Sequence, residues 1–279
     1  MMKKMIFMAL AAFVLVGCSE SEEREVMNEE SAKVTLTFSP YEQTEMTRAA
    51  VSIANVVSQL DVWITGGATP IDLHQSTADA DFGSISVTLD KTKEYTIYAI
   101  GHKCTSAATL TDSIISFPED KVTHSMFYKT IFKPDTVTTL SCEMKRIVSQ
   151  FRLETADTIP DDCKKMRFTV KNVYNQWHIT KGGVNEIDRV STVNIKSRNA
   201  DKTATFSIYT IVTDTKTNHD ITIEALNETD SVLQTKHLQS VPLRNGYKIT
   251  YRGEIFTDKV AAAGFFVDAD LLDDGTVTF

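Results

Sequence analysis

The 279-residue sequence has few of the residues that build catalytic or metal sites, and it lacks the motifs in which they usually occur. It contains no His-Glu-x-x-His, no Gly-x-Ser-x-Gly, no P-loop and no dinucleotide-binding glycine pattern. The histidines form no i, i+4 pair, so we expect surface or half-buried strand positions for all of them. They are His74, His102, His124, His178, His219 and His237. The sequence therefore offers no recognisable catalytic residue and no metal site.

Cysteine is scarce as well, because only Cys104, Cys142 and Cys163 follow Cys18. None of them forms the close Cys-x-x-Cys pair that zinc sites use. An odd number permits one disulfide with a free thiol, or three free thiols. We expect all three to be core residues, and the sequence leaves their pairing open.

Positive charge is in short supply, with 29 Lys and Arg against 37 Asp and Glu and a formal net charge of −8. Loss of residues 1–17 would remove Lys3 and Lys4 and lower the charge to −10. Nucleic acids and anionic lipid surfaces are bound by basic patches. We therefore expect no nucleic acid partner and no membrane attachment through charge.

The N-terminal apolar run, residues 5–16, follows Lys3 and Lys4 and is shorter than the roughly 20 residues that cross a bilayer. It ends on Leu15-Val16-Gly17-Cys18, which resembles the lipobox of bacterial lipoproteins. We predict that residues 1–17 are a signal peptide and that Cys18 becomes a lipid-bearing N-terminus. Two or three acyl chains would hold it firmly on a membrane. An ordinary secretory signal or an uncleaved anchor is the alternative.

Residues 18–32 are rich in Ser and Glu, which predicts a solvated acidic tether. Acidic residues directly after a lipobox cysteine also resemble the surface-export signal of Bacteroidetes lipoproteins. Together with Cys18, this pattern favours a surface-exposed, lipid-anchored location on the cell outer membrane.

Helical periodicity is almost absent, and only residues 50–58 and 122–129 could form short helices. Apolar residues instead alternate with Thr, Ser and Lys, which indicates antiparallel sheets with one face on a core and one in water. The clearest segments are 34–38, 85–89, 206–212, 221–225 and 247–251. The pattern predicts an all-β fold, and about 260 mature residues are more than one small sandwich needs.

We therefore predict two β-sandwich domains, residues 33–143 and 144–279, with the boundary near 141–146. Gly66-Gly67 and Gly182-Gly183 are expected at hairpin tips. The strands of the second domain are expected at 146–155, 165–172, 189–197, 204–213, 219–227, 231–240 and 247–257, with a final hairpin at 264–279.

The two tryptophans lie in strand-like segments, and sugar-binding modules use exposed tryptophans as stacking platforms. We expect Trp63 in the core, whereas Trp177 is equally compatible with the core and with a platform. The acidic run 268–275 has leucines where an EF-hand loop places oxygen ligands, so a solvated turn is expected there rather than a calcium site.

Several segments in order resemble the fimbrillin superfamily of Bacteroidetes, the lipoprotein precursors of pilus shaft, tip and anchor subunits. They are 34–38 with Thr47-Arg48-Ala49, 95–99, 144–153 with Ile159-Pro160, and 241–256. The resemblance is strongest to fimbrial anchor and minor subunits. It implies two tandem transthyretin-like sandwiches, no enzyme activity and no cofactor, in a structural and adhesive pilus subunit.

The resemblance also implies assembly by proteolysis and strand exchange. In shaft pilins of this superfamily an arginine-specific protease cuts after the first strand, which leaves and opens a groove for a strand of another subunit. Applied to this sequence, the resemblance places the cut between Arg48 and Ala49 and makes 34–38 the departing strand. The donor is the C-terminal segment 264–279, where Phe265, Val267, Val277 and Phe279 could insert. The short C-terminal tail favours a tip, anchor or accessory subunit over a shaft subunit.

The expected partners are the outer membrane, through the lipid on Cys18, other pilus subunits, and host or bacterial surface ligands. A glycan-binding surface lipoprotein of a nutrient-uptake system is the alternative function, since it would share the lipobox, the acidic tether and the sandwiches. A hydrolase would need convergent carboxylates or a nucleophile beside its base, and the sequence offers neither.

Overall fold

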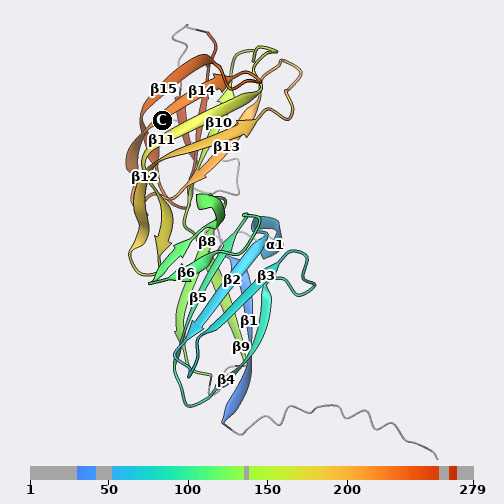
Figure 1. Ribbon diagram of the computed structural model, residues 1–279, viewed down its shortest axis with the longest axis vertical. Helices are drawn as coiled ribbons and strands as arrows, with labels where there is room; N and C mark the ends of the chain where they lie inside the picture. The colour runs from blue at the N-terminus through green and yellow to red at the C-terminus, as the bar shows by residue number, and fades with distance from the viewer. Residues whose placement is uncertain (1–29, 42–51, 135–137, 258–263, 269–279) are drawn as a thin grey trace, which may run out of the picture.

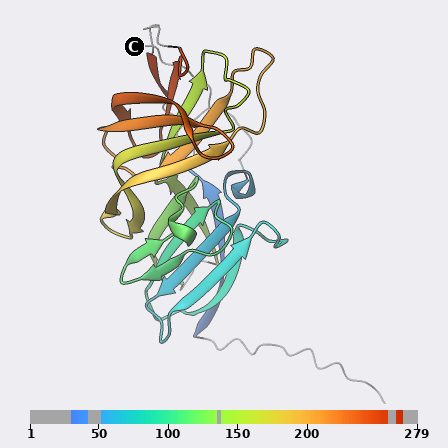
Figure 2. The ribbon, with the colours of Figure 1, turned by 45° about the horizontal axis from the view of Figure 1, so that its top comes forward.

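The computed structural model describes residues 30–41, 52–134, 138–257 and 264–268. Nearly all of its elements are strands, so the all-β prediction is confirmed. Figures 1 and 2 show two lobes joined end to end, with the N-terminal strands in one and the C-terminal strands in the other. Within the described ranges, no helix has the length and apolarity needed to span a bilayer. Cys18, Arg48, Ala49, Val277 and Phe279 lie outside these ranges.

The N-terminal lobe is a sandwich of seven strands in the order β3-β2-β5-β8-β9-β1-β4. Between β8 and β9 only two residue pairs are joined, so the sheet divides there into one layer of β3-β2-β5-β8 and one of β9-β1-β4. The strands are β1 (Ser31–Pro40), β2 (Gln59–Thr65), β3 (Ile71–Ser76), β4 (Ser84–Asp90), β5 (Tyr95–His102), β8 (Met126–Phe132) and β9 (Thr139–Arg146). Alternate apolar residues from both layers meet in one core.

Two short helical elements accompany this lobe, α1 (Ile53–Val56) and η1 (Pro118–Asp120). The α1 helix lies within the segment 50–58 expected to be helical, and Ser52 caps it by accepting the N–H of Ala54. The helix expected at 122–129 is wrong. Residues from Met126 onward form β8, because antiparallel pairing with β5 fixes them in extended conformation.

The C-terminal lobe is a second sandwich. One layer has the order β13-β10-β16-β17, and the other contains β15-β14-β11 with β12 on the far edge of β11. Its strands are β10 (Ser149–Thr155), β11 (Lys165–His178), β12 (Gly182–Asn194), β13 (Thr205–Thr210), β14 (Thr217–Leu226), β15 (Val232–Leu243), β16 (Lys248–Gly253) and β17 (Gly264–Asp268). The β11–β12 hairpin is longer than expected from the sequence, and its turn lies just before Gly182.

The two lobes share one topology. In chain order β1, β2, β3, β4, β5, β8 and β9 correspond to β10 through β16, and each pair holds the same place in its sheet. In both lobes the first strand lies between the seventh strand of this series, parallel to it, and the fourth strand, antiparallel to it. In this correspondence β17 has no counterpart among the described N-terminal strands. The described residues therefore form two sandwiches of the same topology, with β17 added to the second.

The chain passes from the N-terminal lobe to the C-terminal lobe at Ile147 and Val148, between β9 and β10. This point lies just beyond the predicted boundary. The hairpin of β6 (Thr109–Thr111) and β7 (Ile114–Ser116) departs from the predicted division into 33–143 and 144–279. It comes from the N-terminal part of the chain, but β7 pairs with the end of β11 in the C-terminal lobe. A hairpin of one lobe thus extends a sheet of the other.

Further contacts hold the two lobes together at this junction. Arg189 on β12 is 8% exposed and donates hydrogen bonds to the carbonyls of Asp120 and Val122 in the N-terminal lobe, at 3.1 and 2.9 Å. The ring of His124 stacks on that of Tyr209 from β13, with 5.4 Å between centroids and 3° between planes. Buried charge-assisted bonds and ring stacking hold the lobes in one arrangement.

His124 should make the stability of the protein depend on pH. Burial, with the nearby charges of Arg146 and Lys103, lowers its pKa to about 3, and Arg146 Nε donates to its Nε2 at 3.0 Å. Since the unfolded ring has a pKa of about 6.5, its full contribution is present above that pH and is lost as pH falls toward 3. Between pH 6 and 5 the free energy of unfolding should fall by about 1.2 kcal/mol.

Denaturant unfolding at pH 5.0 to 7.5 measures this slope. His124→Gln should flatten it, whereas His237→Gln, a change at an exposed histidine on β15, should leave it unchanged. Equal slopes for the wild type and His124→Gln would show that this ring does not titrate on unfolding.

Candidate functional site

Strand β1 is the structural element on which the predicted strand exchange depends. It contains the predicted departing segment 34–38, and it pairs on both edges, with β4 from Ser31 to Thr37 and with β9 from Thr35 to Pro40. Val34 and Leu36 are fully buried and Phe38 nearly so. If β1 were absent, two strand edges and an apolar trough would be exposed at once.

The described part of the C-terminal segment pairs with its own lobe. Residues Gly264–Asp268 form β17, antiparallel to β16, with Phe265 opposite Tyr251 and Val267 opposite Ile249. Phe265 and Val267 of the predicted donor segment therefore lie on a β-strand, and this strand is paired within its own chain. A donor role would require β17 to leave β16.

Asp157, which is 9% exposed, binds the residues that directly follow β16. Its carboxylate accepts the backbone N–H groups of Ile255, Phe256 and Thr257, at distances of 2.6 to 3.0 Å. Three N–H donors on one carboxylate make a strong local anchor. Residues 255–257 are thus held in place at the end of β16.

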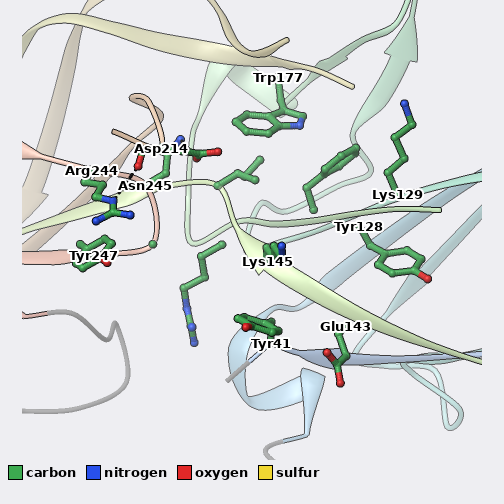
Figure 3. A pocket seen from close by; sticks show the side chains of 14 residues that line it. Tyr41, Tyr128, Lys129, Glu143, Lys145, Trp177, Asp214, Arg244, Asn245 and Tyr247 are labelled. Atoms are coloured by element: carbon green, nitrogen blue, oxygen red, sulfur yellow. Dashed lines mark hydrogen bonds between the residues drawn. The ribbon is translucent and has the colours of Figure 1, made fainter. Parts of the chain in front are cut away.

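A cleft of about 590 Å³ lies at the junction of the lobes, with walls from both (Figure 3). Aromatic, charged and amide side chains line the cleft. The residues are Tyr41, Phe127, Tyr128, Lys129, Glu143, Lys145, Arg146, Ile147, Trp177, Asp214, Arg244, Asn245, Gly246 and Tyr247. The volume is within the range of ordinary small-ligand pockets.

Tryptophan burial resolves the question left open by the sequence. Trp63 is 6% exposed, as expected, and Trp177 is 8% exposed. Trp177 packs against Phe127 across the junction, with centroids 5.8 Å apart, and also lines the cleft. It is therefore a buried wall residue and not an exposed platform.

The expectation of surface or half-buried histidines is wrong for His102, His124 and His219, which are all buried. His102 belongs to a network around Asp61, a carboxylate that is 2% exposed at the centre of β2. Asp61 Oδ2 accepts from the Nε2 of His102 at 2.9 Å and from the N–H of Ala108 at 2.9 Å, and Oδ1 contacts the Nδ1 of His74 at 2.7 Å. Local sequence carries no sign of this network, because its members are distant along the chain.

Cys104 lies beside this network. Its N–H donates to the Nδ1 of His102, and its thiol donates to the carbonyl of Lys121 at 3.2 Å. Cys104, Cys142 and Cys163 are buried free thiols, as core residues are expected to be, and burial raises the pKa of Cys142 to about 11. Across the described part of the chain, no group of three or more His, Cys, Asp or Glu side chains is placed to hold a metal ion.

The fold defines a class, the all-β proteins built from two tandem sandwiches. Solved structures of that class include a Bacteroides thetaiotaomicron protein provisionally described as polysaccharide-binding. It has 11% identity and a TM-score of 0.54, over 85% of this chain and 96% of that one. A Bacteroides ovatus protein provisionally described as an adhesin has 12% identity and a TM-score of 0.54, over 84% and 93% of the two chains.

A second Bacteroides thetaiotaomicron protein, also provisionally described as an adhesin, has 10% identity and a TM-score of 0.51, over 89% and 98% of the two chains. No family model matches the sequence, and no curated protein matches it. At these identities the likeness establishes the fold alone, and it agrees with the predicted all-β architecture of two sandwiches.

Proposed function

We propose that the protein is a surface-exposed, lipid-anchored structural and adhesive subunit of a fimbria, in a tip, anchor or accessory position. The observation that carries the proposal is the place of β1, which completes the N-terminal sandwich from the middle of a sheet. The shared fold with provisionally described Bacteroides adhesins supports the same class of function. Until any cut after Arg48, anchoring would come from the lipid on Cys18, and the protein itself would have no enzyme activity and no cofactor.

Assembly would begin with a cut between Arg48 and Ala49, after the end of β1. Release of β1 would leave the edges of β4 and β9 unpaired above the apolar trough. A strand from another subunit would gain ladder hydrogen bonds on both sides and core burial beneath. The segment 264–279 is the proposed donor, and it would have to exchange its pairing with β16 for pairing in the neighbour.

A glycan-binding surface lipoprotein of a nutrient-uptake system is a second candidate. The cleft favours it, since aromatic rings and polar groups line the same hollow, and a structure with this fold is provisionally described as polysaccharide-binding. The two candidates differ in whether the chain polymerises.

The test is controlled proteolysis of the folded mature protein with an arginine-specific protease. We expect a cut after Arg48, an N-terminus at Ala49, and a ladder of higher oligomers in gel filtration with light scattering. Arg48→Lys should block the cut and keep the protein monomeric. On cells, the wild type should show both Cys18 and Ala49 N-termini. A fully cut protein that stays monomeric at high concentration would refute assembly by strand exchange.

A further inference from the structure

The cleft between the lobes concentrates positive charge in an acidic protein. Four cationic side chains and two carboxylates line it, although the chain as a whole has a net charge of −8. The cations are Lys129, Lys145, Arg146 and Arg244, and the carboxylates are Glu143 and Asp214. A low-dielectric hollow with excess positive charge attracts anions.

Two of these cations are held against aromatic rings. The Nζ of Lys145 lies 5.6 Å from the centre of the Tyr41 ring, and the guanidinium of Arg244 lies 4.3 Å from that of Tyr247. Arg244 Nε also donates to the backbone carbonyl of Asp214 at 2.8 Å, which fixes the guanidinium. Neither cation forms an ion pair with a described residue, so their charges remain available to a ligand.

The two cation–tyrosine pairs come from different lobes. Tyr41 and Lys145 belong to the N-terminal lobe, and Arg244 and Tyr247 precede β16 in the C-terminal lobe. Figure 3 shows both pairs around the same hollow, with the buried ring of Trp177 as a further wall. Aromatic faces present apolar surface beside fixed charge, which suits a ligand that combines a ring with an anionic group.

We propose that this cleft binds the acidic sugar units of a glycan, with the sugar carboxylate at Lys145 and Arg244 and the sugar ring against Tyr41 and Tyr247. The proposal names the ligand class for the adhesive role given above and rests on that role. It applies to the uncleaved chain, because a cut after Arg48 would remove Tyr41 together with β1. A peptide of acidic residues alone would satisfy the cations equally well, but it offers no flat apolar face to the tyrosines. The rings therefore favour the sugar over the peptide.

The test is calorimetric titration of the full mature chain in detergent with a tetragalacturonate, and with a neutral galactose tetrasaccharide as the matched ligand. We expect saturable binding of the acidic oligosaccharide only. Lys145→Glu with Arg244→Glu should weaken it at least about tenfold, since two charge-assisted contacts become repulsive. Lys196→Glu with Lys236→Glu, which makes the same change of net charge outside the cleft, should leave affinity unchanged.

Tyr41→Ala and Tyr247→Ala test the ring contacts separately, with both cations in place, and each should weaken binding by about fivefold or more. The proposal is overturned if tetragalacturonate does not bind at millimolar concentration, or if the double charge reversal does not alter its affinity. Equal binding of hexaglutamate, unaffected by either tyrosine change, would overturn the sugar assignment. Assembly after cleavage at Arg48 is measured without any glycan, so failure of that experiment is separate from failure of this one.

Discussion

A chain that starts at Ala49 and therefore lacks β1 should not remain a stable monomer. Val34, Leu36 and Phe38 are buried in the core of the N-terminal lobe. Their burial contributes about 1.5–3 kcal/mol each, and the ladders to β4 and β9 are lost with them. That loss is comparable to the total stability of a typical domain, about 5–15 kcal/mol. We expect oligomers or a loosened N-terminal lobe, measured by light scattering and amide hydrogen exchange.

A synthetic peptide of residues 31–41 should reverse this effect. It restores Tyr41 and the whole of β1, so it should bind the truncated chain, return it to a monomer and protect β4 and β9 from exchange. The same peptide with Leu36→Asp is the control, because a charge at a fully buried position is strongly unfavourable. A truncated chain that is monomeric, fully protected and indifferent to the peptide would show that β1 is dispensable.

Much of this architecture is predictable from local sequence. The alternation in 34–38 and 247–251 reports which side chains face a core, and β1 and β16 are found there. Gly66 and Gly182 have positive φ at or beside hairpin turns, as expected for residues without a Cβ. Such features depend on near neighbours in the chain, so a periodic pattern records them.

The junction between the lobes could not be predicted in this way. The cleft brings together Tyr41, Trp177 and Arg244 from separate segments, and none has a distinctive local pattern. The β6–β7 hairpin reads as part of the first domain, yet it pairs with β11 of the second lobe. Strand partners distant in sequence are chosen by tertiary packing, which alternation alone does not encode.

Asp61 should be among the residues of the N-terminal lobe least tolerant of substitution. Because Nδ1 of His102 accepts the N–H of Cys104, its Nε2 carries the proton and donates to Asp61. Asp61→Ala would leave this N–H and that of Ala108 buried without an acceptor. Breaking such a network typically costs about 3–5 kcal/mol. Thermal and denaturant unfolding followed by circular dichroism would measure the loss.

Two further substitutions separate the hydrogen bonds of Asp61 from its position in a strand. Asp61→Asn can keep an oxygen toward His102 and Ala108 and turn its amide toward His74, so it should be milder than Asp61→Ala. Asp72→Ala changes an exposed aspartate on the adjacent strand β3, and its effect should stay within about 0.5 kcal/mol. If Asp61→Ala were as mild as Asp72→Ala, the buried carboxylate would not stabilise the lobe. A large loss for Asp61→Ala alone would instead show that this carboxylate holds β2 and β5 to the loop at Ala108, which leads into the hairpin that joins the lobes.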